Sequence, residues 1–162
     1  MKTILLVGAC GSGKTWVMLE LIKRLQLTKE RKIGLFWYRL HRDEIKHTVG
    51  VLGYYDGSTY QGSDRLSMAV MKDCDKFKTM CKQKIIIAEG DRFTNSTFIK
   101  AFYPYIIKIT GDGSRGRALR KSNQSERQIK AIQTRVNNIP ADCEVPNSTI
   151  ALKEVLNIIQ NN

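Results

Sequence analysis

Residues 8–15 spell Gly-Ala-Cys-Gly-Ser-Gly-Lys-Thr, which fits the pattern G-x-x-x-x-G-K-[ST]. The apolar run 3–7 before it predicts a buried strand, and residues 16–25 after it carry apolar side chains at helical spacing. In such a strand–loop–helix unit, backbone N–H groups and the helix N-terminus bind phosphate. Lys14 is expected to reach the β- and γ-phosphates, and the Thr15 hydroxyl to ligate Mg²⁺. The octet, a P-loop, therefore predicts a site for ATP and Mg²⁺, with binding residues Gly8, Gly11, Ser12, Gly13, Lys14 and Thr15.

The chain has 162 residues, and we expect one domain over 1–162 with a full hydrophobic core. No apolar run approaches the roughly 20 residues that cross a bilayer, so no membrane contact is expected. A signal peptide is not expected either, because its cleavage would destroy the octet. These features favour a cytoplasmic protein. The four cysteines lack C-x-x-C spacing, so neither a zinc site nor a disulfide framework is expected.

Apolar runs alternate with stretches of helical spacing along the chain, which is typical of the α/β class with a parallel sheet and helices on both faces. We expect a P-loop fold with a five-stranded parallel sheet and right-handed crossovers. In residues 63–83 the apolar side chains repeat at steps of three or four, which predicts one helix. Ser148 is expected to cap the last helix. The expected strands are residues 2–8, 32–38, 84–89, 105–109 and 143–145, with an irregular segment at 39–62.

Carboxylates occur at two places that suit phosphoryl transfer. Glu89 and Asp91 follow the apolar run 85–88, and an acidic residue at such a strand tip holds Mg²⁺ or its bound waters. Asp64 stands at the start of the segment 63–83, where helix capping and orientation of an acceptor hydroxyl are both compatible with its position. Asp56 is the second candidate for the acceptor carboxylate.

A basic segment, residues 111–135, is expected to form a lid, and we call it the lid segment. Its first part carries Arg115, Arg117 and Arg120 among glycines, which suits a segment that closes over ATP and stabilises the transferring phosphoryl group. A solvated helix face is the alternative. The formal net charge of the chain is +12, which favours contact with a polyanion such as DNA. Tyr54, Tyr55 and Tyr60 either stack on a nucleobase or pack the loop against the core.

The octet, the acidic strand tip at 89–92, the lid segment and the closing helix at 148–160 together resemble the small P-loop kinases that carry a lid, the nucleotide and nucleoside kinases. More narrowly, residues 51–56 (Val-Leu-Gly-Tyr-Tyr-Asp) and 62–67 (Gly-Ser-Asp-Arg-Leu-Ser) look like a pattern in compact phage-encoded P-loop kinases. Some of these are similar to 5-hydroxymethyluracil DNA kinases. The resemblance implies a nucleotide-kinase type of fold, ATP, Mg²⁺, a DNA substrate and a phage gene expressed in a bacterial host.

The chain departs from related kinases at identifiable positions. Cys10 and Thr15 replace a proline and a glycine of the adenylate kinase loop, and Asp91-Arg92-Phe93 only approaches the Asp-Arg-Tyr of thymidylate kinases. The leading hypothesis is an ATP-dependent kinase acting on a nucleotide hydroxyl, specifically 5-hydroxymethyluracil in DNA. The alternatives are a deoxynucleoside monophosphate kinase and a nucleotide-binding DNA-processing ATPase. The expected catalytic residues are Lys14, Asp64, Arg115, Arg117 and Arg120, and the expected metal ligands are Thr15, Glu89 and Asp91.

Overall fold

The computed structural model describes residues 1–42, 49–58, 61–119 and 125–161, so Tyr60 and Arg120 lie outside the described residues. The strands are β1 (Lys2–Gly8), β2 (Lys29–Ile33), β3 (Phe36–Leu40), β4 (Val49–Leu52), β5 (Ile85–Glu89), β6 (Tyr105–Ile109) and β7 (Cys143–Val145). The helices are α1 (Lys14–Arg24), α2 (Cys74–Met80), α3 (Ser96–Phe102), α4 (Ser114–Leu119), α5 (Glu126–Asn137) and α6 (Ser148–Gln160). Three 3₁₀ turns accompany them: η1 (Ser63–Arg65), η2 (Val70–Asp73) and η3 (Asp91–Thr94).

These strands form one sheet in the order β2-β3-β4-β5-β1-β6-β7. The five strands from β4 to β7 in that order pair in parallel, whereas β2 and β3 pair antiparallel with each other and β3 pairs antiparallel with β4. The expectation of a five-stranded parallel sheet is therefore wrong: the sheet is mixed and has seven strands. The P-loop strand β1 lies directly beside β5, the strand that ends in Glu89.

The difference arises in residues 29–52. A single strand was expected at 32–38, but Gly34 adopts a φ of 57° there and, with Leu35, turns the chain back between β2 and β3. Asp73 holds the turn, because its Oδ2 accepts a hydrogen bond of 2.7 Å from the Leu35 N–H. The parallel strand beside β5 is instead β4, whose four residues are all buried. Four residues that include a glycine give too short a hydrophobic pattern for a strand to be predicted.

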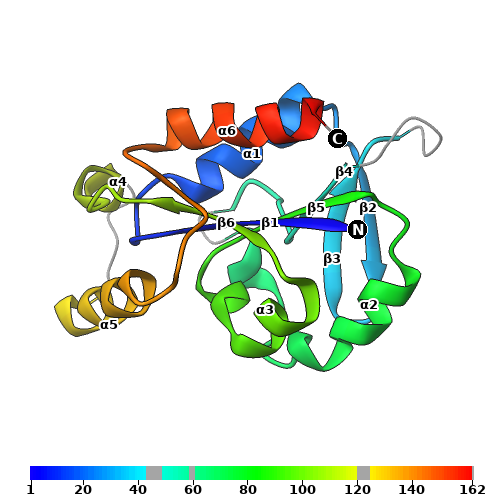
Figure 1. Cartoon of the computed structure of the whole chain (residues 1–162), viewed down its shortest axis with the longest axis horizontal. Coiled ribbons are helices and arrows are strands. Elements are labelled where there is room, and N and C mark those ends of the chain that lie inside the picture. Colours follow the sequence, from blue (N-terminus) through cyan, green and yellow to red (C-terminus); the bar gives the residue numbers. More distant parts are fainter. Residues whose placement is uncertain (43–48, 59–60, 120–124, 162) are drawn as a thin grey trace.

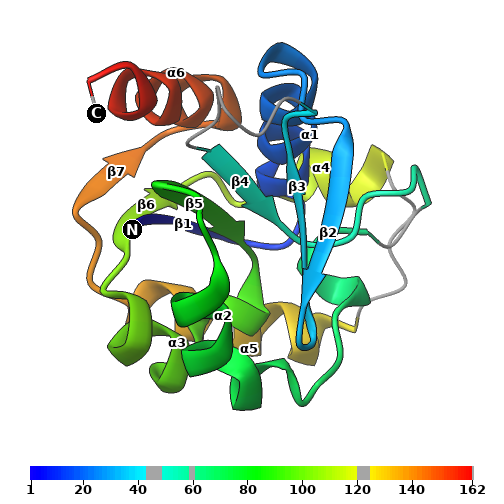
Figure 2. The same ribbon diagram turned by 90° about the vertical axis from the view of Figure 1, so that its right-hand side faces the viewer.

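Helices cover both faces of the sheet. In Figure 1, α1 and α6 lie above the sheet and α2, α3 and α5 below it, and Figure 2 shows the same two layers after a quarter turn. Successive residues of β1 pack against opposite faces of the sheet. Ile4 and Leu6 pack on the face covered by α1 and α6, while Leu5 and Val7 pack on the opposite face. Burial on both faces explains why β1 is apolar throughout.

The expected helix over 63–83 is also wrong in part. The chain forms η1, η2 and α2 in succession, because Leu66 adopts an extended conformation with a ψ of 152° after the first turn. The buried positions nevertheless match the pattern, since Leu66, Val70, Cys74 and Phe77 all lie in the core. At the last helix, Asn147 rather than Ser148 is the N-cap, and its side chain accepts a hydrogen bond from Ile150 N–H. Within the described residues, none of the helices combines the length and the apolar character that a membrane crossing requires.

Candidate functional site

The P-loop connects β1 to α1 at the carboxyl edge of the parallel strands. Gly11 and Gly13 have φ values of 83° and 92°, which side-chain-bearing residues rarely adopt. Lys14 folds back over the loop, and its Nζ donates hydrogen bonds to the carbonyl oxygens of Gly8 at 2.9 Å and Ala9 at 2.8 Å. The lysine ammonium is thus held inside the loop that is expected to surround the phosphates.

Thr15 and Glu89 lie side by side next to this loop. Glu89 ends β5 with only 4% of its surface exposed, and its Oε1 accepts a hydrogen bond from Thr15 Oγ1 at 3.4 Å. A hydroxyl and a carboxylate are hard oxygen ligands, so this pair fits the donor set of Mg²⁺. Gly62 also approaches Glu89, because a Cβ at that position would lie 2.5 Å from Oε1. The structure therefore brings two of the three expected metal ligands together.

The third expected ligand, Asp91, has a different neighbour. Its Oδ2 forms an ion pair with Arg135 of α5, and its backbone carbonyl accepts a hydrogen bond from Thr94 Oγ1. Asp91 thus ties the lid segment to the end of β5. The adjacent Arg92 directs one guanidinium nitrogen to the sulfur of Met68. The Nε atom of Arg92 is buried and has no hydrogen-bond partner among the residues that the structure describes.

The first helix of the lid segment docks on the P-loop through glycines. A Cβ at Gly116 would lie 2.1 Å from the carbonyl oxygen of Gly11, and one at Gly113 would lie 2.0 Å from that of Cys10. A Cβ at Gly11 would in turn lie 2.7 Å from the backbone nitrogen of Arg117. Only backbone without side chains permits this approach. The P-loop and α4 therefore touch backbone to backbone.

This docking places one of the expected arginines at the P-loop. The Arg117 guanidinium donates hydrogen bonds to the Cys10 carbonyl at 2.8 Å and to the Asp112 carbonyl at 2.6 Å. Arg115 also belongs to α4, but its side chain is not among those described, and Arg120 falls outside the described residues altogether. Arg117 is thus the lid arginine that the structure places in contact with the P-loop.

Of the two candidate acceptor carboxylates, Asp56 has an ion pair and side-chain hydrogen bonds, whereas Asp64 has neither with the described residues. Asp56 pairs with Arg65 at 3.5 Å, and hydrogen bonds from Ser58 lower the pKa of its carboxyl. Asp64 is exposed on η1 and has neither an ion pair nor a side-chain hydrogen bond with any described residue.

Tyr55 is a buried tyrosine near Glu89. Burial raises the pKa of the Tyr55 phenol well above its usual value, and the negative charges of Glu89 and Asp64 raise it further. Gly62 approaches both Glu89 and Tyr55, because a Cβ there would lie 2.5 Å from Glu89 Oε1 and 3.3 Å from the Tyr55 hydroxyl oxygen. The Tyr55 hydroxyl donates to the Leu52 carbonyl, so this tyrosine packs in the core and is not available to stack on a base.

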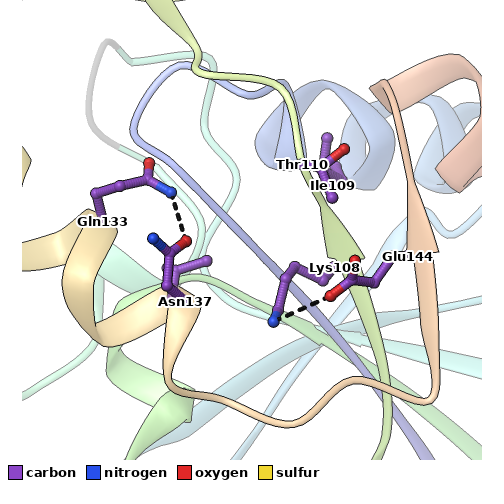
Figure 3. Close-up of a pocket in the computed structure, with 7 residues that line it drawn as sticks. Lys108, Ile109, Thr110, Gln133, Asn137 and Glu144 are labelled. Atoms are coloured by element: carbon purple, nitrogen blue, oxygen red, sulfur yellow. Dashed lines mark hydrogen bonds and ion pairs between the residues drawn. The ribbon is translucent and has the colours of Figure 1, made fainter.

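A polar cavity of about 220 Å³ lies between α5 and the strands β6 and β7 (Figure 3). Lys108 and Glu144 form an ion pair of 3.2 Å on one side, and Gln133 bonds to Asn137 on the other. The cavity contains none of the residues expected to act on ATP. Its lining residues are Lys108, Ile109, Thr110, Gln133, Val136, Asn137 and Glu144.

Two features of the site escape the sequence analysis. The pairing of Arg135 with Asp91 joins residues 44 apart and has no local sequence signal. The glycine docking does have a signal: Gly113 and Gly116 are three residues apart at the start of a helix, where glycine lowers helix stability unless a close contact requires it. Glycines at such positions therefore indicate that α4 packs closely against another stretch of backbone.

Comparison with known proteins identifies the family. The model of the family ResIII, described as type III restriction enzyme, res subunit, matches residues 1–130 of the 162-residue chain. The matched region includes the P-loop, Glu89 and the docked helix α4. A search of the curated proteins found no match. The chain thus belongs to the ResIII family and is a P-loop NTPase.

Proposed function

We propose that this chain uses MgATP to phosphorylate a hydroxyl group presented by DNA. The observation that carries the proposal is the pair of distinct carboxylates at one end of the sheet. Glu89 is buried beside Thr15, while Asp64 is exposed, unpaired among the described residues and two positions after Gly62, which closely approaches the Glu89 carboxylate. One carboxylate suits a metal ion and the other suits an acceptor.

The docked lid segment supports transfer to an acceptor other than bulk water. α4 contacts the P-loop at Gly11 and Cys10, and Arg135 of α5 is tied to Asp91. A cover of this kind excludes water from the reacting phosphate and delivers Arg117 to it. Arginine stabilises the negative charge that develops on the transferring group.

The proposed reaction assigns one task to each residue. Lys14 exchanges its contacts with the Gly8 and Ala9 carbonyls for the phosphates of ATP, and Asp64 accepts the proton of the acceptor hydroxyl. The acceptor oxygen forms a bond to the γ-phosphorus as the bond to the β-γ bridging oxygen breaks, and ADP leaves. When bound by Thr15 and Glu89, Mg²⁺ neutralises charge on the phosphates.

Water is the second candidate acceptor. The ResIII match favours an ATPase that works on DNA, and hydrolysis of ATP is the activity to which that match points. In this case Asp64 or Glu89 orients a water molecule instead of a hydroxyl. The two candidates share the P-loop, Mg²⁺ and DNA, and they differ only in the oxygen that attacks the γ-phosphorus.

The deciding experiment follows the γ-phosphoryl group of labelled ATP. The reactions contain no DNA, unmodified DNA, DNA with 5-hydroxymethyluracil, or free deoxynucleoside monophosphates. Label in DNA supports the proposal, and label in a monophosphate supports a free-nucleotide kinase instead. Inorganic phosphate whose release DNA accelerates, without label in DNA, supports the ATPase. Lys14→Ala should abolish any of these activities, whereas Lys23→Ala, at an exposed position of α1, should not.

A further inference from the structure

Two aromatic rings flanked by two cations form a row that starts on the edge strand β2 and crosses β3 to the segment after β4. Lys32 Nζ lies 5.1 Å from the centre of the Trp37 ring, and the Trp37 and Tyr54 rings meet edge to face with centres 5.4 Å apart. The Arg65 guanidinium then lies 5.4 Å from the Tyr54 ring. We call these four residues the edge ladder.

Backbone contacts hold the edge ladder in place. Gly53 N–H donates to the Trp37 carbonyl at 2.8 Å, and Tyr54 exchanges two hydrogen bonds with Gly62. Trp37 therefore lies on β3, and Tyr54 on the segment that directly follows β4. Because the backbone of both residues is held by the sheet and its adjoining bridge and the two rings pack on each other, binding a partner there costs little ordering entropy.

The edge ladder is accessible to a partner. β2 is the edge strand of the sheet (Figure 2), and Lys32 and Arg65 are exposed while Trp37 and Tyr54 are half-buried. The hairpin over residues 29–40 carries four basic residues and one acidic residue. The Asp56 partner of Arg65 is itself exposed, and an exposed ion pair of this kind gives way to a stronger anion at little cost.

We propose that the edge ladder binds single-stranded DNA and leads it to Asp64. Arg65, the last member, is the neighbour of Asp64 in the chain and on η1, so the ladder ends beside the proposed acceptor carboxylate. Rings that stack on bases, together with cations that contact phosphates, are the shared feature of proteins that bind single strands. In a duplex the base faces are already stacked, so paired DNA does not offer them. The direction toward Asp64 rests on the proposed function, but the binding itself does not.

Trp37 can report on binding directly. The chain has two tryptophans, and Trp16→Phe leaves Trp37 as the sole tryptophan, whose fluorescence can be excited selectively over that of the tyrosines. Without ATP, an oligothymidylate single strand should quench the fluorescence of this variant, whereas the same length of duplex should quench it far less. Base stacking contributes about 1–3 kcal/mol per base. Tyr54→Ala should therefore weaken single-strand binding roughly 5- to 150-fold.

Matched variants separate the edge ladder from general effects. Tyr54→Phe keeps the ring and should bind like the parent. Tyr103→Ala removes a ring that is 82% exposed directly after α3 and should change nothing. Arg65→Ala should lower the slope of log affinity against log salt by about 0.7, as expected for one lost phosphate contact to a single strand. Equal binding by Tyr54→Ala and Tyr103→Ala, or equal quenching by duplex, would overturn the inference. Binding by the edge ladder without any phosphoryl transfer would overturn the proposed function alone.

Discussion

The Arg117 guanidinium and the Cys10 carbonyl are 2.8 Å apart, so a residue of the lid segment and a residue of the P-loop share a hydrogen bond across 107 positions of the sequence. Backbone contacts between Gly116 and Gly11 support the same junction. The carbonyl that accepts this bond belongs to the loop that we propose surrounds the phosphates. Arg117 is therefore positioned to exchange its hydrogen bond with the neutral Cys10 carbonyl for one with a charged phosphate oxygen. Hydrogen bonds to charged groups are stronger than those to neutral groups.

Replacing Arg117 with alanine should lower kcat about 100- to 1,000-fold, as the loss of one donor to a transition-state oxygen does in other enzymes. The affinity for ATP should change much less, because the interaction strengthens in the transition state. Steady-state phosphoryl transfer and nucleotide binding give the two values. Arg127→Ala, at an exposed position of α5, is the matched control and should behave as the parent. An equal loss in both variants would mean that general positive charge, not this contact, matters.

Glu89→Gln should slow turnover by about 100- to 10,000-fold while ATP still binds. The substitution keeps the shape of the side chain but removes the negative charge beside Thr15. The Mg²⁺ concentration for half-maximal activity should rise as well, and a titration of activity against Mg²⁺ measures it. Glu144→Gln alters a carboxylate that faces the polar cavity and should leave the Mg²⁺ dependence unchanged. An unchanged titration for Glu89→Gln would remove this residue from the metal site.

The sequence predicts the parts of this fold whose signals are local. The P-loop, β5 with Glu89 at its tip, β6, β7 and α6 all lie where the apolar patterns indicate. The β2–β3 hairpin was missed because Gly34 looks like an interior strand residue, and only its positive φ and its contact with Asp73 reveal the turn. For residues 63–83, the pattern predicts the buried positions correctly but wrongly predicts one continuous helix. The spacing of apolar residues indicates which side chains are buried more reliably than it indicates an unbroken helix.

The site likewise has one part that the sequence predicts and one part that it does not. Thr15 and Glu89 come together because β1, which leads into the P-loop, is the neighbour of β5 in the sheet, and the carboxyl ends of parallel strands meet at the same edge. The contact that Asp91 makes with Arg135 depends on how the lid segment packs, and no local pattern encodes it. Pairwise contacts across long stretches of chain are the information that a single sequence lacks.

Gly116→Ala should loosen the lid segment without unfolding the protein. The new methyl group would lie 2.1 Å from the Gly11 carbonyl oxygen, and relieving such overpacking costs about 1–3 kcal/mol. Gly116 has no positive φ, so alanine is compatible with its backbone conformation and only the close approach is disturbed. We expect faster proteolysis within residues 111–137, a higher KM for ATP and a Tm that falls by several degrees at most, about 2–4 °C for each kcal/mol lost.

The control for this prediction is Ala118→Ser, at an exposed position of the same helix. It should leave proteolysis and KM as they are in the parent. A resistant lid segment in Gly116→Ala would show that α4 does not need backbone contact with the P-loop.

Cys74 should make the stability of the protein depend on pH in the alkaline range. Burial raises the pKa of the Cys74 thiol to about 11, with smaller contributions from the charges of Asp75 and Asp73. The unfolded chain releases this proton at a lower pH, near the ordinary thiol pKa of 9.0. The stabilising contribution is therefore complete below pH 9.0 and is lost as the pH rises toward 11. Urea unfolding of the parent and of Cys74→Ala between pH 8 and about 11 measures the effect. The alanine variant is expected to be less stable at pH 8, because it loses core packing, and its stability should fall less steeply as pH rises. Parallel curves for the two proteins would mean that the Cys74 thiol has the same pKa in the folded and unfolded states.

Cys143 offers a comparison variant. Burial is the chief cause that raises the pKa of its thiol, but Cys143 is only half-buried. We therefore expect Cys143→Ala to change the slope of stability against pH less than Cys74→Ala does.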